Sequence, residues 1–252
     1  ERGLLRRLVG TLGRLIKRLF WAGLLIGALC LFAWLVWLLL LAPKRTPLVA
    51  LTAAPYSWPA PPNAYAAEDF GKLVALDGET ITLRGTDEPI LTAEDFLARV
   101  DKEVKRHRDQ KSKLPLIVWA SMHGVAYGPE SPAYLVPPQA SPTDPDSWIL
   151  LDEVRDRLEA VGGGQNAVLI LDSNRIQVDW NLGIVHNHFA GRVKDVYENR
   201  SSEAGDGGNV SVLMSASFDQ VAHVSPDLRG SVFGHYLQLG LAGAADQAAG
   251  TG

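Results

Sequence analysis

Short apolar runs of about five residues recur along the chain and alternate with segments of helical periodicity. The apolar runs predict buried strands at residues 48–51, 116–120, 167–171 and 210–214. Apolar positions spaced three and four residues apart predict helices that begin after Thr92 and over residues 148–161, 182–197 and 231–241. Strands and helices in this alternation are typical of a mainly parallel sheet with helices on both faces. The sequence therefore predicts an α/β fold, a three-layer α/β/α sandwich.

The segments between these elements give weaker signals. Residues 72–76 and 80–84 are separated by Asp77-Gly78-Glu79, and an Asp-Gly turn predicts a pair of short strands. Prolines are frequent at residues 55–62 and 127–147, which predicts irregular loops there.

The amino-terminal part differs in composition from everything after it. Phe20 to Ala42 contains no charged residue, and 23 helical residues span roughly 34 Å, enough to cross the ~30 Å hydrocarbon core of a bilayer. Residues 1–19 are basic, with leucines at helical spacing, which is typical of a helix lying on an anionic membrane surface. We expect a single-pass transmembrane helix, with the N-terminus cytoplasmic and the main domain extracytoplasmic by the positive-inside rule.

Charge is also distributed unevenly. Residues 1–45 hold 8 of the 24 Lys and Arg and 1 of the 28 Asp and Glu, so the remainder has 16 basic and 27 acidic residues, a formal charge of −11. A domain this acidic is a poor binder of nucleic acid. The single cysteine, Cys30, lies in the apolar segment, so the domain after it cannot form an internal disulfide.

Polar side chains follow two of the predicted strands. His123-Gly124 comes shortly after the strand at residues 116–120, and Asp172-Ser173-Asn174-Arg175 follows the strand at residues 167–171. Ligands of open α/β sheets bind at the carboxyl ends of strands, where both segments are expected to lie. These residues are the candidate site.

The order of these segments resembles the caspase-like family of cysteine peptidases (clan CD, peptidase C14), especially bacterial caspase-like and metacaspase proteins. The matching motifs are His123-Gly124, Asp172-Ser173 with Arg175, Leu135-Val136-Pro137-Pro138, and Gly230-Ser231-Val232-Phe233 with the Leu237 to Asp246 segment. The resemblance runs from about Leu48 to Asp246. Together with the composition of the amino-terminal part, it divides the chain into a basic segment (1–19), a transmembrane helix (20–42), a linker with the first strand (43–62), a caspase-like domain (63–246) whose sheet includes that strand, and a tail (247–252).

The resemblance also shows a departure from the family. It implies that His123 is the catalytic histidine and that the nucleophilic cysteine should stand at residue 174, where this chain has asparagine. An amide has no nucleophile comparable to a thiolate. Ser173 is adjacent, but a serine needs a strong general base and its side chain points in another direction.

A second departure concerns the expected binding pocket. In metacaspase-like members an acidic pocket accepts a basic side chain, and Asp172 and Asp219 match part of that pattern. Where the pattern ends in an acid, this chain has His223-Val224. The binding residues implied are Asp172, Arg175, Gly124 and Asp219.

Simpler interpretations of the same residues stay open. His123 could be a hydrogen-bonded polar residue near a strand end, and Asp172 could cap a turn or pair with Arg175. His186-Asn187-His188 has no evident third ligand and, on a helix, points its imidazoles to different sides, so we expect neither a metal nor a cofactor.

The sequence thus predicts a membrane-anchored caspase-like pseudopeptidase that acts by binding a peptide or protein, with a basic side chain near Asp172 and His123 or with a second caspase-like chain as partner. An active C14 endopeptidase or an unusual hydrolase using Ser173 is one alternative, and a structural envelope domain is another. A chain that begins at Glu1 and ends in a Gly-rich stretch is also expected to be a fragment.

Overall fold

The computed structural model describes residues 2–37, 45–53, 56, 60–84, 88–162, 165–173, 176–198 and 209–244. Contacts divide the chain into two compact units, residues 1–44 and residues 45–252. The second unit holds the buried core.

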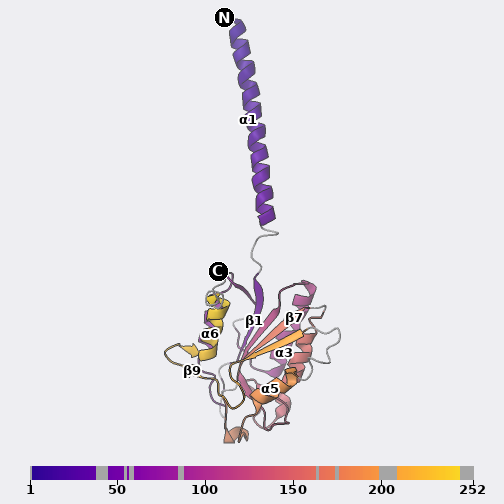
Figure 1. Ribbon diagram of the computed structural model, residues 1–252, viewed down its shortest axis with the longest axis vertical. Coiled ribbons are helices and arrows are strands. Elements are labelled where there is room, and N and C mark those ends of the chain that lie inside the picture. Colours follow the sequence, from indigo (N-terminus) through magenta and orange to yellow (C-terminus); the bar gives the residue numbers. More distant parts are fainter. Residues whose placement is uncertain are drawn as a thin grey trace. The chain divides into compact units, whose positions relative to one another are not determined.

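A parallel five-stranded sheet forms the centre of the second unit (Figure 1). Its strands, in spatial order, are β2 (Ile81–Arg84), β1 (Thr46–Thr52), β3 (Leu116–Ser121), β7 (Asn166–Asp172) and β8 (Asn209–Met214). All four pairings between neighbours are parallel. The predicted strands at 48–51, 116–120, 167–171 and 210–214 are confirmed.

Three helices cover one face of this sheet: α3 (Ala93–Asp109), α4 (Leu151–Glu159) and α5 (Phe189–Glu198). Their apolar side chains join those on one side of β1, β3 and β7 in the largest core cluster. Phe96 from α3, Val154 from α4 and Val193 from α5 are completely buried in it.

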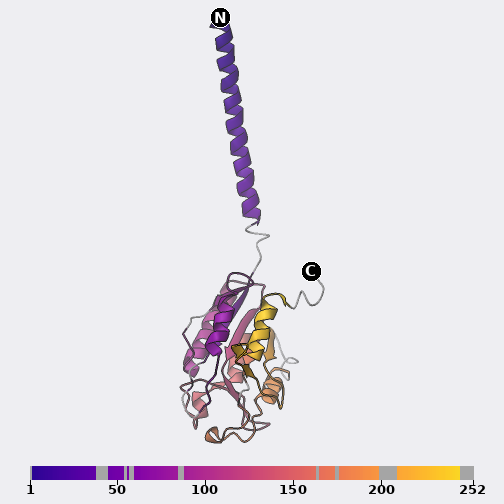
Figure 2. The ribbon, with the colours of Figure 1, turned by 90° about the vertical axis from the view of Figure 1, so that its left-hand side faces the viewer.

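Two helices, α2 (Ala66–Val74) and α6 (Val232–Leu241), pack on the opposite face. Figure 2 shows them side by side in front of the sheet. Trp119 and Ile170, which neighbour each other across β3 and β7, point into this second cluster, while the preceding and following residues of each strand point into the first. The alternation of side chains along a strand thus fills both layers, and the predicted α/β/α sandwich is confirmed.

Short elements extend the sheet edge from which the carboxyl ends of the strands emerge. One small antiparallel sheet has the order β4 (His123–Val125), β5 (Tyr134–Val136) and β6 (Ile149–Leu150), and another joins β9 (Val224–Ser225) to β10 (Gly230–Ser231). Two 3-10 helices, η2 (Pro145–Ser147) and η3 (Trp180–Leu182), lie in the connecting segments.

Side-chain caps explain where two of the helices begin. Thr92 accepts a hydrogen bond from the backbone N–H of Asp95 at 3.2 Å, and Ser231 accepts one from Gly234 at 2.8 Å. Such caps satisfy N–H groups that have no partner within the helix, so the predicted starts of α3 and α6 are confirmed.

Three predicted elements differ from the observed ones. The expected strand at 72–76 is wrong, because Lys72 to Val74 are the last turn of α2, and β2 pairs in parallel with β1 instead of forming a hairpin. The helix expected over 148–161 begins only at Leu151, after β6. The helix expected over 182–197 begins at Phe189, because η3 and a turn precede it.

The first unit contains one long helix, α1 (Arg2–Val36). It joins the two segments that the sequence analysis separated at residue 20. Within the described residues, no helix meets the length and apolarity that a membrane crossing requires. The predicted transmembrane helix is therefore not supported, and its residues 38–42 lie outside the described part, as do 247–252 of the predicted tail.

Candidate functional site

The carboxyl ends of three neighbouring strands meet at one edge of the sheet. Thr52 of β1 is in register with Ser121 of β3, and Ser121 is in register with Asp172 of β7. Neighbouring parallel strands lie about 4.8 Å apart. The segments that follow β3 and β7, which contain His123 and Ser173, therefore start side by side.

His123 is the first residue of β4, two residues after β3 ends, and its side chain is buried. Its Nε2 atom lies 2.7 Å from the backbone carbonyl oxygen of Pro61. A carbonyl can only accept a hydrogen bond, so Nε2 carries the proton in neutral histidine and Nδ1 carries the lone pair. This is the tautomer in which Nδ1 can act as a base.

Two side chains hold the backbone around His123. Tyr56 accepts a hydrogen bond from the His123 N–H at 3.1 Å, donates one to the Val136 carbonyl at 2.6 Å, and places its ring 4.3 Å from the imidazole, centre to centre. Asn63 donates to the carbonyl oxygens of Ala53 and Ser121, at 3.1 and 3.0 Å. The histidine is thus fixed by Tyr56 and Pro61, and Asn63 from the same stretch of chain holds the end of β3 just before it.

Asp172 and Ser173 are both buried at the end of β7. Ser215, which follows β8, fixes the backbone of Ser173, because its hydroxyl accepts from the Ser173 N–H at 3.2 Å and donates to the Ser173 carbonyl at 2.9 Å. The Ser173 hydroxyl has no hydrogen-bond partner among the described residues. No general base is therefore in contact with it.

The other residues of this motif, Asn174 and Arg175, lie outside the described residues. Their expected roles as the altered nucleophile position and as a binding residue stay predictions.

Gly124 has a packing role in the structure. A Cβ atom at this position would overlap the ring of Phe189, the first residue of α5. The Gly124 carbonyl accepts a 2.7 Å hydrogen bond from Asn187, whose side chain also accepts from the Phe189 N–H at 3.0 Å. Glycine here allows α5 to pack closely against β4, which helps to hold His123 in place.

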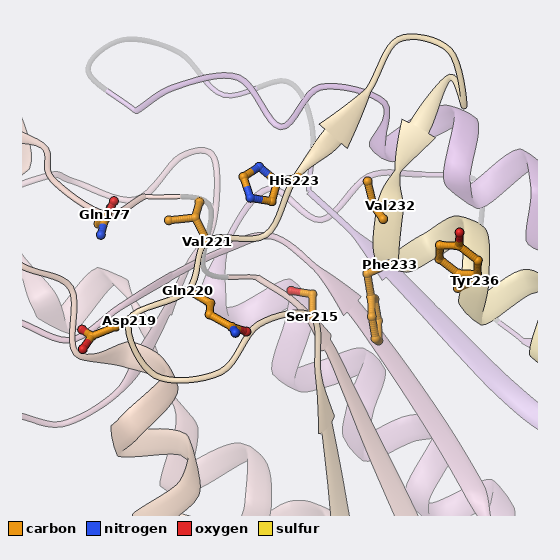
Figure 3. Close-up of a pocket in the computed structure, with 9 residues that line it drawn as sticks. All are labelled: Gln177, Ser215, Asp219, Gln220, Val221, His223, Val232, Phe233 and Tyr236. Atoms are coloured by element: carbon orange, nitrogen blue, oxygen red, sulfur yellow. The ribbon is translucent and has the colours of Figure 1, made fainter.

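A cavity of about 750 Å³ opens beside this strand edge. Figure 3 shows its walls, which come from the end of β8, the loop that follows β8, the first turns of α6 and the segment after β7. The lining residues are Gln177, Ser215, Asp219, Gln220, Val221, His223, Val232, Phe233 and Tyr236. Ser215 is shared between the cavity wall and the hydrogen bonds that fix Ser173.

Asp219 supplies the carboxylate of this cavity. Its side chain is 61 % exposed and lies 3.3 Å from Nε2 of His186, measured from Oδ1. Its φ of 59° is in the left-handed region, which Asp and Asn tolerate better than most residues. The carboxylate is therefore accessible to a cationic ligand, in water-screened surroundings.

The sequence predicted His123, Asp172, Ser173 and Asp219 as site residues, and it did not indicate other residues that surround them. Tyr56 and Asn63 lie in or near a proline-rich loop whose sequence carries no sign that it packs against His123. The Pro61 carbonyl is a backbone group, which no side-chain pattern could have indicated. Gln177 and Tyr236 were also missed, because they reach the cavity only through the fold.

Among the described residues, no group of three or more His, Cys, Asp or Glu is arranged to hold a metal ion. His186 and His188 lie close, with ring centres 4.6 Å apart, and Asp219 contacts His186, but these three described residues are not arranged to hold a metal ion.

The parallel sheet and the helical layers on its two faces form a caspase-like α/β fold. A solved structure with this likeness is caspase-1 from Spodoptera frugiperda, at a TM-score of 0.51 and 13 % identity, covering 79 % of this chain and 69 % of that one. At this identity the likeness is one of fold. No protein-family model matches the chain, and no curated protein matches it in sequence.

Proposed function

We propose that the domain is a caspase-like pseudopeptidase that binds a peptide segment in the cavity beside the ends of β7 and β8. The observation that carries the proposal is the position of this cavity, whose wall residue Ser215 also fixes the backbone of Ser173. Ligands of open α/β sheets bind at this edge. The sequence supports binding over cleavage, because residue 174 is asparagine.

The lining of the cavity indicates the chemistry of the peptide. Phe233, Tyr236 and Val221 provide apolar surface, while Gln177 and Gln220 provide amide groups that can bond to a peptide backbone. Asp219 provides one exposed carboxylate. We infer a peptide with a basic side chain near Asp219, flanked by residues that contact the apolar wall.

Asp219 should contribute modestly to binding. Exposed ion pairs stabilise by about 0.2–1 kcal/mol, which corresponds to a loss of about 1.4- to fivefold in affinity when the charge is removed. We expect Asp219→Asn to weaken binding of an arginine-containing peptide to that extent and to leave an uncharged analogue unaffected. Asparagine is also compatible with the positive φ at this position.

Fluorescence anisotropy with labelled peptides that contain Arg, Lys or neutral residues measures this effect on the full chain. Asp227→Asn is the matched control, because Asp227 is exposed and does not line the cavity. Equal losses in both variants, or no binding of any peptide by the wild type, would contradict the proposal and favour a structural domain.

The hydrolase alternative predicts a different result. If Ser173 were a nucleophile, fluorogenic Arg, Lys or Asp peptides would be cleaved, and His123→Ala would abolish the cleavage. The buried Ser173 hydroxyl has no base within hydrogen-bond reach among the described residues. We therefore expect no cleavage by wild type, Ser173→Ala or His123→Ala.

We also propose that α1 associates the domain with a membrane. Where the side chains of α1 are described, large apolar ones are more than half exposed, among them Phe20, Trp21, Leu25, Phe32 and Trp34. Exposed apolar surface of this extent is typical of a membrane or protein contact. If α1 associates with lipid, the full chain should co-elute with lipid nanodiscs, and a chain with Leu25→Asp and Phe32→Asp should do so less.

A further inference from the structure

A second cavity, of about 610 Å³, lies at the opposite edge of the sheet, where the strands begin. It is formed by the turn between α3 and β3 and the turn between α4 and β7, so it lies between two adjacent strands of the central sheet. The lining residues are Arg108, Lys111, Ser112, Lys113, Val161, Gly162 and Gln165. We call it the amino-edge cavity.

The amino-edge cavity is lined by cations and by no acidic residue. Arg108, Lys111 and Lys113 form no ion pair in the described part of the chain. The hydroxyl of Ser112 and the amide of Gln165 add polar groups to the wall, and the Oε1 atom of Gln165 is buried without a hydrogen-bond partner there. The cavity thus offers positive charge and hydrogen-bonding groups without a counter-charge of its own.

This charge contrasts with the rest of the domain. Residues 102–113 contain 6 of the 16 basic and 2 of the 27 acidic residues that follow residue 45, which leaves 10 basic and 25 acidic residues elsewhere in the domain. A strongly acidic domain repels anions over most of its surface. Three of these cations, Arg108, Lys111 and Lys113, line one cavity that has no acidic residue, and an anion would be directed there.

Helix ends explain only part of this concentration. α3 and α4 both end at the amino-edge cavity, and each helix C-terminus carries about −0.5 of an elementary charge, which favours nearby cations. Two helix ends therefore offset about one positive charge, whereas Arg108, Lys111 and Lys113 provide three. An excess of about two positive charges is left for a ligand.

We propose that the amino-edge cavity binds a phosphate group, and that the phosphate is that of an anionic phospholipid. Arginine and lysine together with hydroxyl and amide groups are the side chains that bind phosphate. The lipid assignment rests on the proposed membrane association of α1. β1, the strand next to β3, begins at Thr46, at the sheet edge where the cavity lies.

Lysine acetylation of the full chain in nanodiscs tests this proposal, with mass spectrometry as the readout for each lysine. In discs that contain phosphatidylglycerol, Lys111 and Lys113 should react about fivefold more slowly than in phosphatidylcholine discs, because a bound phosphate covers the amines. Lys194, on α5 and outside the cavity, should react at the same rate in both.

Two variants, each of which removes the charge of one lysine, show whether the residues of the cavity bind the phosphate together. Lys111→Asn removes one cation at a position with φ of 48°, which asparagine tolerates, so the fold should be retained. It should reduce the protection of Lys113 by about threefold or more, since one phosphate contact is lost. Lys105→Gln, on the exposed side of α3, is the matched control and should leave that protection intact.

A second arm distinguishes a lipid from a soluble phosphate. Pyrophosphate is added to the chain in phosphatidylcholine discs and, separately, in detergent. Protection by pyrophosphate alone would overturn the lipid and identify a soluble phosphate as the ligand. Protection by neither probe, or equal protection in the Lys111→Asn and Lys105→Gln variants, would overturn the site.

These results are separable from those on the proposed function. Failure of the chain to co-elute with nanodiscs would reject both membrane association and the lipid assignment, while the pyrophosphate arm in detergent still tests the cavity. Peptide binding at the opposite edge should be unchanged in Lys111→Asn.

Discussion

At the residue scale, packing explains a residue to which the sequence analysis gave a binding role. Gly124 follows His123 in a motif that resembles a catalytic one, yet its contact with Phe189 shows a steric role. Asp219 and Ser173 remain candidates for contact with a ligand or its surroundings. Single substitutions, followed by a measurement of stability or of ligand binding, distinguish a packing role from a binding role.

Gly124→Ala should destabilise the domain. The new Cβ would overlap the Phe189 ring, and overpacking of this kind costs about 1–3 kcal/mol. Chemical denaturation followed by circular dichroism measures the change in the free energy of unfolding.

Gly71→Ala is the matched control for this substitution. A Cβ at Gly71 meets nothing within 4 Å, and the residue lies within α2. Alanine there should stabilise by about 0.5–1 kcal/mol, because glycine loses more conformational freedom in a helix. If both variants had the same stability, the packing role of Gly124 would be wrong.

His107 should make the domain less stable in mild acid. The residue is completely buried in α3, and burial together with the nearby Arg84 guanidinium holds the pKa of His107 below its ordinary value of 6.5, although the Leu114 backbone opposes the shift. The unfolded chain therefore binds the proton more readily. The contribution of neutral His107 to the free energy of unfolding should be fully present above about pH 6.5 and decrease as the pH drops below that value.

Denaturation of wild type and His107→Gln between pH 5 and 7.5 tests this assignment. The wild type should lose stability on acidification, and the variant should lose less over the same range. Glu103 also faces this cluster, 3.7 Å from Arg84. An identical pH dependence in both proteins would show that another group is responsible.

At the element scale, one buried carboxylate connects the two helices on the second face of the sheet. Asp69 of α2 accepts a 2.8 Å hydrogen bond from the backbone N–H of Ser231, the residue that caps α6, and pairs with Lys72 at 2.9 Å. Lys72 in turn donates to the carbonyl oxygens of Leu228 and Arg229. The segment that precedes α6, beside the cavity at the carboxyl edge of the sheet, is thus held by α2.

Asp69→Asn should destabilise the domain by about 1–3 kcal/mol, because it removes the charge from two charge-assisted hydrogen bonds in a buried site. Thermal denaturation gives the size of the effect. Glu68→Gln is the control, since Glu68 is an exposed acid on the same helix. If the two variants had equal effects, Asp69 would not connect α2 to α6.

The sequence predicted best the elements whose hydrophobic pattern or capping residue clearly marks their boundaries. β3 and β7 are continuous apolar runs because both of their faces are covered, and α3 begins where Thr92 caps it. The residues from Lys72 to Val74 were mistaken for a strand because a short apolar run does not distinguish helix from strand. Tertiary contacts, including those of Lys72 with the loop before α6, favour the helix over a strand at these residues.

At the scale of the whole molecule, the fold places different charges at opposite edges of one sheet. The carboxyl edge carries the buried His123 and the cavity lined by Asp219, and the amino edge carries the cationic cavity. The sequence predicted the first edge, because motifs after apolar runs indicate strand ends. It predicted a pocket with Asp219, but neither the rest of that cavity's lining nor the amino-edge cavity, since both cavities are formed by loops that are distant in sequence.

The central claim is that the cavity at the carboxyl edge binds a peptide and that the domain does not cleave it. Hydrogen exchange of the full chain, with and without a saturating arginine-containing peptide, tests this most directly. We predict slower exchange in residues 215–223 and in the first turns of α6, with the peptide recovered intact. Unchanged exchange at both segments, or cleavage of the peptide that His123→Ala abolishes, would contradict the account.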